Sequence, residues 1–295
     1  MAYKTLIPGL VTFDSNKNHM NNMYISSDFS YYSESARPAP FHYTEHCVPT
    51  IAPPKSPYDM RSEYFSKEGS TWRYDRPSRF LPLTLTYNTA TKVFTYAKNL
   101  SYIPFAIGGV FPPGELIADI INYHLFIAGF VIMRGIAYSY KGKIVCITAP
   151  GCNGKTSFLD SMLIKGAEYI AEDLLVLDLQ RGMVYPTCPF IKRHAWQKNR
   201  TLKTVAQDMK IVQTPMYIDM LYCTENSMNP SYSPRQKTFS EFLLVNDRYF
   251  LKNRLVRSMI FEEGTWEKVM HTMQSPITIP HTVIPMKHFD YASIL

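Results

Sequence analysis

The eight residues Ala149–Thr156, "APGCNGKT", have the residue types and spacing of a phosphate-binding loop (P-loop), with Ala149 in place of the first glycine. In such a loop, small residues let backbone N–H groups approach the phosphates of a nucleotide, and a lysine, here Lys155, neutralises the β- and γ-phosphates. The hydroxyl of Thr156 can bind Mg²⁺. The stretch therefore predicts a site for ATP and Mg²⁺, whose nucleotide-contacting residues are Ala149, Gly151, Cys152, Asn153, Gly154, Lys155, Thr156 and Ser157.

The flanking residues predict the elements that a P-loop needs. The segments "GIAYSY" and "IVCITA", joined by the turn "KGK", predict two short strands, so the loop leaves a strand directly. After the loop, an apolar stripe predicts a helix that stops at Gly166 and points its positive N-terminus into the loop. The stripe consists of Phe158, Leu159, Met162 and Leu163.

Two neighbouring acids, Glu172 and Asp173 in "IAEDLLVL", begin an apolar run that predicts a buried strand beside the strand preceding the loop. At that position one carboxylate could hold Mg²⁺ and the other could accept a proton from an incoming hydroxyl. The alternative is a solvated pair of acids in a turn.

The segment from Arg134 to Asp173 resembles the HPr kinase/phosphorylase (HPr serine kinase) family. That family has a strand, a P-loop, a helix ending in a basic residue plus glycine, and an "ADD" tripeptide, at spacings matched by Lys165, Gly166, Ala171, Glu172 and Asp173. The resemblance implies a fold distinct from ordinary protein kinases and an ATP-dependent transfer of phosphate to a serine. It gives Glu172 the position of the proton-accepting acid and Asp173 that of its metal-associated neighbour, so the expected metal ligands are Thr156 and Asp173.

Two residues depart from the family pattern: Arg134 stands where the family usually has histidine, and Glu172 where it has aspartate. The "LEIRG"-like signature of the enzymes that act on HPr is not found. The chain is more similar to divergent relatives that phosphorylate a serine of a lasso precursor peptide during natural-product biosynthesis. Arg134 could stabilise the charge of the transferring group, with a structural ion pair as the alternative.

Lys192 and Arg193 follow a proline-containing turn and could clamp phosphate or an acidic peptide substrate, although a solvated basic turn explains them equally well. The segment Thr265–Met273 predicts an amphipathic helix. The chain from Met1 to about Tyr87 is rich in Tyr, Ser, Asn and Pro. We expect residues 1–112 to form a β-rich N-terminal domain that could recognise the substrate, with a hairpin within 80–97. Its tyrosines suit half-buried strands or a ligand-stacking surface.

A helix predicted from Pro113 onward leads into the second domain, residues 113–295, which we expect to be an α/β P-loop nucleotide-binding domain of HPr kinase type.

The chain has 295 residues and a formal charge of +7 without basic runs, which does not favour nucleic acid as a partner. The most apolar window, Leu125–Met133, is too short to span a bilayer, so we expect no membrane segment and read it as buried core. The N-terminus lacks a signal-peptide pattern, and five scattered cysteines indicate reduced thiols; both favour the cytoplasm.

The sequence thus predicts an ATP-dependent serine kinase of a peptide or protein, with Lys155, Glu172, Asp173 and Arg134 as its catalytic residues. Two alternatives stay open: a nucleotide-binding regulatory or assembly module without transfer, and a kinase of a small hydroxylated metabolite. The identity of the acceptor, the choice of ATP or GTP, and the formation of a homo-oligomer are left open by the sequence.

Overall fold

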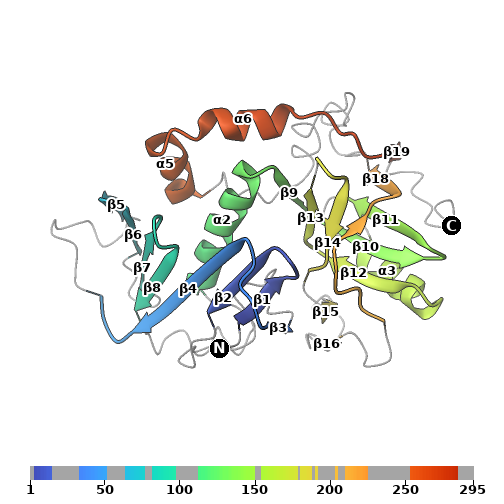
Figure 1. Ribbon diagram of the computed structural model, residues 1–295, viewed down its shortest axis with the longest axis horizontal. Coiled ribbons are helices and arrows are strands. Elements are labelled where there is room, and N and C mark those ends of the chain that lie inside the picture. The colour runs from blue at the N-terminus through green and yellow to red at the C-terminus, as the bar shows by residue number, and fades with distance from the viewer. Residues whose placement is uncertain are drawn as a thin grey trace. The chain divides into compact units, whose positions relative to one another are not determined.

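The computed structural model describes residues 3–14, 33–51, 64–76, 82–97, 112–149, 154–178, 180–187, 190–191, 203–204, 210–224 and 253–284. The chain forms two compact units: Met1–Ile121 with Asn253–Leu255 (unit 1), and Asn122–Lys252 with Val256–Leu295 (unit 2). The predicted boundary at residue 112 coincides with the first residue of helix α2 (Pro112–Ile127), and the division between the units falls inside that helix. The mixture of helices and sheets confirms the coarse prediction of an α and β structure (Figure 1).

Unit 1 contains an eight-stranded sheet in the order β3-β1-β2-β4-β8-β7-β6-β5. Its last two strands in sequence form the antiparallel hairpin predicted within residues 80–97, which confirms that prediction. The strands are β1 (Tyr3–Ile7), β2 (Val11–Asp14), β3 (Ser33–Ser35), β4 (Phe41–Val48), β5 (Tyr64–Glu68), β6 (Thr71–Arg76), β7 (Leu83–Asn88) and β8 (Val93–Ala97).

Aromatic side chains on one face of this sheet form its core. Phe13, Tyr43, Tyr87 and Phe94 are fully buried, and the Tyr87 and Phe94 rings stack at 4.4 Å between centroids. Phe13 also stacks on Tyr43, at 5.5 Å. For these tyrosines the structure confirms the strand-core interpretation over a ligand-stacking surface.

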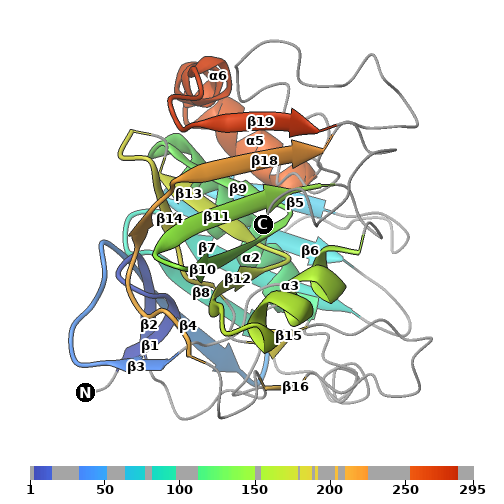
Figure 2. The ribbon, with the colours of Figure 1, turned by 90° about the vertical axis from the view of Figure 1, so that its right-hand side faces the viewer.

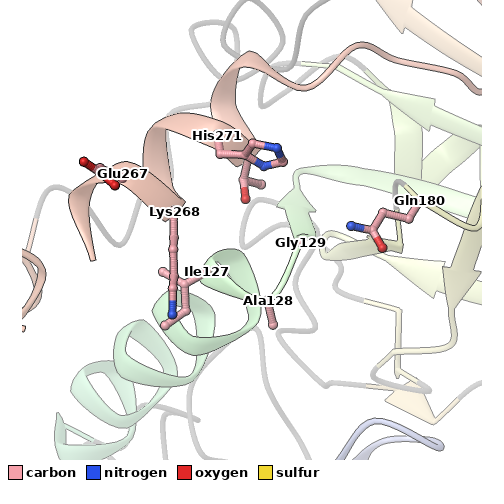
Figure 3. A pocket seen from close by; sticks show the side chains of 8 residues that line it. Ile127, Ala128, Gly129, Gln180, Glu267, Lys268 and His271 are labelled. Atoms are coloured by element: carbon pink, nitrogen blue, oxygen red, sulfur yellow. The ribbon is translucent and has the colours of Figure 1, made fainter. Parts of the chain in front are cut away.

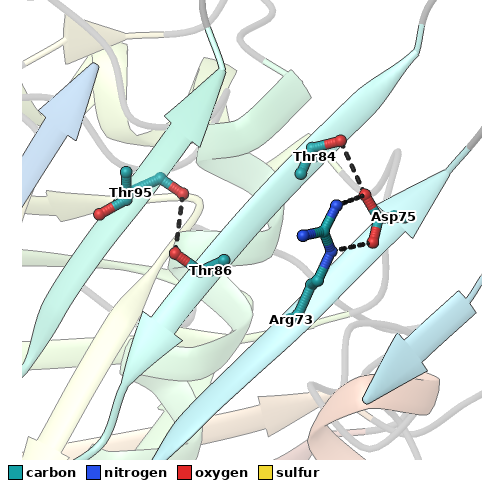
Figure 4. Close-up of polar contacts among 5 residues, drawn as sticks. All are labelled: Arg73, Asp75, Thr84, Thr86 and Thr95. Carbon is teal, nitrogen blue, oxygen red and sulfur yellow. Dashed lines mark hydrogen bonds and ion pairs between the residues drawn. The ribbon is translucent and has the colours of Figure 1, made fainter. Parts of the chain in front are cut away.

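The opposite face of the same sheet is polar and carries a buried acid. Asp75 is only 1% exposed, and Arg73 donates to both of its carboxylate oxygens, through Nε at 2.5 Å and Nη2 at 3.0 Å. The Thr84 hydroxyl donates to the same carboxylate at 2.8 Å (Figure 4). Because every partner lies on the neighbouring strands β6 and β7, this network satisfies a buried charge within the sheet and is structural.

Unit 2 is built on a five-stranded mixed sheet in the order β12-β10-β11-β18-β19. Strand β11 is antiparallel to β10 and parallel to β18, as Figure 2 shows. The two strands predicted before the P-loop are β10 and β11, and both are confirmed. The bounds are β10 (Gly135–Tyr140), β11 (Lys143–Thr148), β12 (Glu168–Glu172), β18 (Met220–Thr224) and β19 (His281–Ile284).

Helix α3 (Lys155–Ile164) covers one face of this sheet (Figure 2). The four apolar residues of the predicted stripe are all buried, and they pack on β10, β11 and β12 in one cluster with Ile136, Tyr138, Val145, Ile147 and Tyr169. Gly166 has φ +91°, and the N–H groups of Gly166 and Ala167 donate to the carbonyls of Leu163 and Met162. This left-handed ending confirms the predicted stop of the helix at Gly166.

A second, four-stranded antiparallel sheet of unit 2 has the order β17-β14-β13-β9. Among the described residues no helix is long and apolar enough to cross a membrane. The helix predicted at Thr265–Met273 is confirmed as α6. The remaining bounds are β9 (Phe130–Met133), β13 (Leu175–Asp178), β14 (Met183–Tyr185), β15 (Phe190–Ile191), β16 (Lys203–Thr204), β17 (Met216–Tyr217), α5 (Arg254–Glu262) and α6 (Trp266–Gln274).

Candidate functional site

The predicted P-loop joins the end of β11 to the start of α3. Its first residue, Ala149, is buried, and Gly154 immediately before α3 has φ +75°, a conformation that glycine adopts without steric cost. Gly151, Cys152 and Asn153 lie outside the described residues. The order of the elements, with the motif between a strand and a helix, is the one that a P-loop requires.

Lys155 lies in the first turn of α3 and is 9% exposed. Its ammonium group donates a 2.8 Å hydrogen bond to the carbonyl oxygen of Ala149, the first residue of the motif. Ser157, two positions further, is exposed at the same helix end. The helix N-terminus and the ammonium thus lie at one place, where positive potential favours an anion such as a phosphate.

Thr156 and Glu172 meet although they lie in different elements. The Thr156 hydroxyl donates a 2.7 Å hydrogen bond to Oε1 of Glu172, which is 4% exposed at the end of β12. One of the two predicted acids, Glu172, is therefore in contact with the last residue of the motif, through a side-chain hydroxyl of α3.

A β-bulge directs Glu172 toward α3. Glu172 pairs with Ile136 and Tyr169 pairs with Tyr138, but the register shifts between Ala137 and Tyr138. Because 169 and 172 differ by an odd number, a regular strand would place these two side chains on opposite faces. The extra residue restores the face, so Glu172 joins Tyr169 on the side of the sheet that α3 covers.

The second acid, Asp173, lies at a corner where two strands pass between the sheets of unit 2. Strand β9 ends at Met133 and β10 begins at Gly135, while β12 ends at Glu172 and β13 begins at Leu175. Arg134 and Asp173 are thus the residues at the crossing. Nε of Arg134 lies 3.9 Å from Oδ1 of Asp173, and the N–H of Gly135 donates to the carbonyl of Asp173 at 3.3 Å.

The corner is tightly held by residues that the sequence analysis did not select. Thr187, 1% exposed, donates from its hydroxyl to the Leu174 carbonyl at 2.8 Å, and Thr148 donates to the Arg134 carbonyl at 2.8 Å. A Cβ on Gly135 would overlap the Leu175 side chain and lie 2.5 Å from the Ile147 carbonyl oxygen. These contacts join residues far apart in the sequence. The one feature that could have pointed to them is Gly135, because a glycine at the start of a strand can mark a close approach of backbone.

The prediction of one buried strand beside the loop strand is wrong in two respects. The run "YIAEDLLVLDL" forms two strands in different sheets, β12 and β13, and β10 lies between β12 and β11. The break falls at Asp173, whose φ of +66° places it in the left-handed region. Aspartate tolerates that region better than branched residues do, and a residue held there ends a strand.

Thr156 and Glu172, which are in contact, and Asp173, the residue after Glu172, carry oxygen donors of the kind that suits Mg²⁺. Thr156 offers a hydroxyl, and Glu172 and Asp173 offer carboxylates, which are the hard ligands this ion prefers. Within the described residues no group of three or more His, Cys, Asp or Glu side chains could hold a metal ion. An ion at this place would therefore depend on nucleotide phosphates and water for its other ligands.

Cys146 lies in β11, the strand that precedes the loop, and does not belong to this donor set. Burial raises the pKa of its thiol, and burial likewise raises the pKa of the Tyr138 phenol on β10. Both groups therefore stay protonated near neutral pH, so Cys146 is not poised as a thiolate nucleophile.

Unit 2 also has a separate open pocket of about 450 Å³, drawn in Figure 3. It lies where α2 ends and β9 begins, and His271 and Gln180 face each other across it (Figure 3). None of its lining residues belongs to the predicted nucleotide site: they are Ile127, Ala128, Gly129, Gln180, Glu267, Lys268, His271 and Thr272.

Residues that were each predicted for the site meet in three pairs: Lys155 with Ala149, Thr156 with Glu172, and Arg134 with Asp173. Lys192 and Arg193 lie outside the described residues. Comparison with protein-family models gives no match, and comparison with curated proteins gives none either. The likeness of residues 134–173 to the HPr kinase family therefore stays a prediction.

Proposed function

We propose that the protein is a Mg²⁺- and ATP-dependent serine kinase whose acceptor is a peptide or protein. The observation that carries the proposal is the 2.7 Å hydrogen bond between Thr156 and Glu172. It joins the last residue of a P-loop motif to the acid that the HPr kinase resemblance assigns as the proton acceptor. In this proposal unit 2 contains a P-loop domain of HPr kinase type, and the protein works in the cytoplasm.

The residues at the start of α3 would bind the nucleotide. The helix N-terminus and the ammonium of Lys155 favour the β- and γ-phosphates electrostatically. Thr156 and Asp173 would hold Mg²⁺, which when bound neutralises the negative charge of the phosphates. Arg134, at the same corner as Asp173, would stabilise charge on the transferring phosphoryl group.

Glu172 would act as the general base. As the serine oxygen forms its bond to the γ-phosphorus, the bond from that phosphorus to the β,γ-bridging oxygen breaks and ADP leaves. The serine proton passes to the carboxylate of Glu172, and the phosphorylated serine departs. The carboxylate is buried and accepts a hydrogen bond from Thr156, and both features fix its orientation. A general base needs a fixed orientation in order to accept the proton of the attacking hydroxyl.

The test is a transfer assay with labelled ATP, MgCl₂ and a set of serine-containing peptides, in which phosphopeptide is identified by mass spectrometry. Each peptide has a matched partner in which the serine is alanine. Because the resemblance points to lasso precursor peptides, the set includes sequences of that class. Phosphate on the serine peptide alone supports the kinase, and ATP binding without transfer to any peptide or protein acceptor contradicts it.

A nucleotide-binding module without transfer is the second candidate, and the position of Asp173 favours it. This acid faces Arg134 in a strained corner between two sheets, a placement that also suits a purely structural pair. Asp173→Asn separates the two. If Asp173 holds the metal, the change weakens Mg²⁺-dependent ATP binding and transfer together. If Asp173 only stabilises the fold through its ion pair with Arg134, the free energy of unfolding falls while the Mg²⁺ dependence of ATP binding is unchanged.

A further inference from the structure

Thr187 lies two residues after the end of β14 and is only 1% exposed. Both of its hydrogen-bond donors reach the segment that carries the two acids. Its N–H donates to the carbonyl of Ile170 at 3.1 Å, and its hydroxyl donates to the carbonyl of Leu174 at 2.8 Å. Because Glu172 and Asp173 lie between these two points, one residue holds the acid segment, residues 170–174, on both sides.

The first of these bonds goes to the bulge in β12. The register of β12 with β10 runs through Ala171 and Tyr169 and skips Ile170, which is therefore the extra residue of the bulge. The backbone of an extra residue lies outside the ladder, so its buried carbonyl needs another donor. The N–H of Thr187 is that donor. Thr187 is thus fixed to the same bulge that turns Glu172 toward α3.

The second bond, from the hydroxyl of Thr187, acts at the other end of the acid segment, beside Asp173. Asp173 has φ +66°, and the N–H of Gly135 donates to its carbonyl at 3.3 Å. The Thr187 hydroxyl holds the next carbonyl, that of Leu174. A residue other than glycine stays in the left-handed region only where its surroundings over-determine it, and such residues cluster at functional sites. These two carbonyl bonds supply the restraint at Asp173.

We propose that Thr187 is a positioning residue of the metal site, and that its hydroxyl holds Asp173 where the carboxylate reaches Mg²⁺. This inference rests on the proposed kinase site and adds a residue that contacts neither the nucleotide nor the metal. Replacing a residue that orients a metal ligand typically lowers metal affinity or activity by roughly 10- to 100-fold. The threonine carries no charge, so its effect on the metal has to pass through the backbone that places Asp173.

Thr272 in α6 is the matched control for the loss of a buried hydroxyl. It is 4% exposed, and its hydroxyl donates to the carbonyl of Phe126 at 3.0 Å. Thr187→Val and Thr272→Val each remove one buried bond from a hydroxyl to a carbonyl and keep the shape of the side chain, so both should lower the stability to urea. Only Thr187 holds a carbonyl next to an expected metal ligand.

The test is ATP binding by the full chain at a series of MgCl₂ concentrations, beside urea unfolding of each variant. Thr187→Val should raise the Mg²⁺ concentration needed for half-maximal ATP binding by about tenfold or more. Thr187→Ser keeps the hydroxyl and should match the parent, and Thr272→Val should lose stability with an unchanged Mg²⁺ dependence. If Thr187→Val has the Mg²⁺ dependence of the parent, the hydroxyl serves the fold alone and the inference is overturned.

A double-mutant cycle tests the route through Asp173. In the Asp173→Asn background, Thr187→Val should change the Mg²⁺ requirement by about twofold at most, because the ligand that it positions is already lost. A full tenfold change in that background contradicts the proposal.

Thr187→Ala is a second variant without the hydroxyl. If neither Thr187→Ala nor Thr187→Val folds while Thr187→Ser and Thr272→Val do, the role of the residue lies in the fold and the proposal falls. A parent protein whose ATP binding does not depend on Mg²⁺ contradicts the proposed kinase site itself. Because the parent is measured in the same series, that outcome is distinguished from a failure at Thr187 alone.

Discussion

The hydroxyl of Thr156 donates a 2.7 Å hydrogen bond to Oε1 of Glu172, although the two residues are 16 positions apart. The contact depends on the register shift in β12, since this shift turns Glu172 onto the face that α3 covers. A hydroxyl suited to Mg²⁺ and a buried carboxylate suited to accept a proton therefore share one hydrogen bond. Substitutions at either end should separate nucleotide binding from phosphate transfer.

Lys155→Ala should abolish the stabilisation of the protein by ATP. A bound ligand stabilises the folded state by mass action, by about 2.7 kcal/mol at one hundred times its dissociation constant. Removing the ammonium at the start of α3 removes the charge that neutralises the phosphates. The measurement is the shift of melting temperature on adding ATP, with Lys143→Ala, an exposed lysine of β11, as the matched control. A full ATP-induced shift in the Lys155→Ala protein would contradict the P-loop assignment.

Thr156→Val should weaken ATP binding chiefly when Mg²⁺ is present, because the lost hydroxyl serves the metal rather than the phosphates. Thr156→Ser retains the hydroxyl and should bind like the parent. The measurement is calorimetric titration of each variant with ATP in MgCl₂ and in a chelator. Equal losses of affinity in both buffers would mean that the hydroxyl has no role toward the metal.

The sequence was informative where structure depends on neighbouring residues. Helix α3 ends where Gly166 predicts, with φ +91°, and the stripe from Phe158 to Leu163 is the buried face. The hairpin β7–β8 and the strands β10 and β11 also follow from alternation and turn residues within short segments. The candidate loop was visible for the same reason, since its pattern is local.

The corner at Arg134 and Asp173 was not predictable from the sequence. A continuous apolar run gives no sign that the chain changes sheets, because both β12 and β13 are buried and both read as apolar. The break is set by the long-range contacts of Gly135, Thr148 and Thr187. The same holds for the bulge in β12, which exists only relative to β10.

Gly135→Ala should destabilise the protein by roughly 1–3 kcal/mol, the usual cost of overpacking a core. Its Cβ would meet the Leu175 side chain and the Ile147 backbone oxygen, and backbone cannot move aside cheaply. Gly142→Ala is the comparison: no atom lies within 4 Å of its Cβ, so only the left-handed φ of +77° costs energy, about 1 kcal/mol. Equilibrium urea unfolding measures both, and a smaller loss for Gly135→Ala than for Gly142→Ala would show that the corner has room.

Stability should fall as the pH rises above about 8. Burial raises the pKa of the Cys146 and Cys223 thiols and of the Tyr43 and Tyr138 phenols, so the folded protein keeps these protons. The unfolded chain releases them near the ordinary values of about 8.5 for cysteine and about 10 for tyrosine. The folded state then binds more protons, so the free energy of unfolding decreases with pH, by up to about 1.4 kcal/mol per unit for each group.

Urea unfolding at several pH values from 7 to 11 measures this slope. The stabilisation is complete below about pH 8 and is lost progressively above it, since each raised pKa lies above its unfolded value. Cys146→Ala with Cys223→Ala should remove the part of the slope that begins near pH 8.5. A free energy of unfolding that stays constant up to pH 11 would be incompatible with buried, protonated thiols and phenols.

Glu172→Gln should leave ATP affinity within a few fold and lower phosphate transfer by roughly 10² or more, the usual scale of general-base catalysis. The amide has the shape of the carboxylate, and its oxygen can still accept the hydrogen bond from Thr156, so the start of α3 should keep its geometry. The amide cannot accept the serine proton. Binding is measured by ATP titration, and transfer by the rate of phosphopeptide formation in mass spectrometry.

The matched control is Glu168→Gln, at the other end of the same strand, where the side chain is 39% exposed and pairs with Lys210 on the surface. That variant should bind ATP and transfer phosphate at the parent rate, because surface ion pairs contribute little and this one lies away from the loop. If Glu172→Gln also transfers at the parent rate, Glu172 is not the base. If it loses ATP binding to the same extent as transfer, the carboxylate supports the nucleotide site rather than the proton transfer.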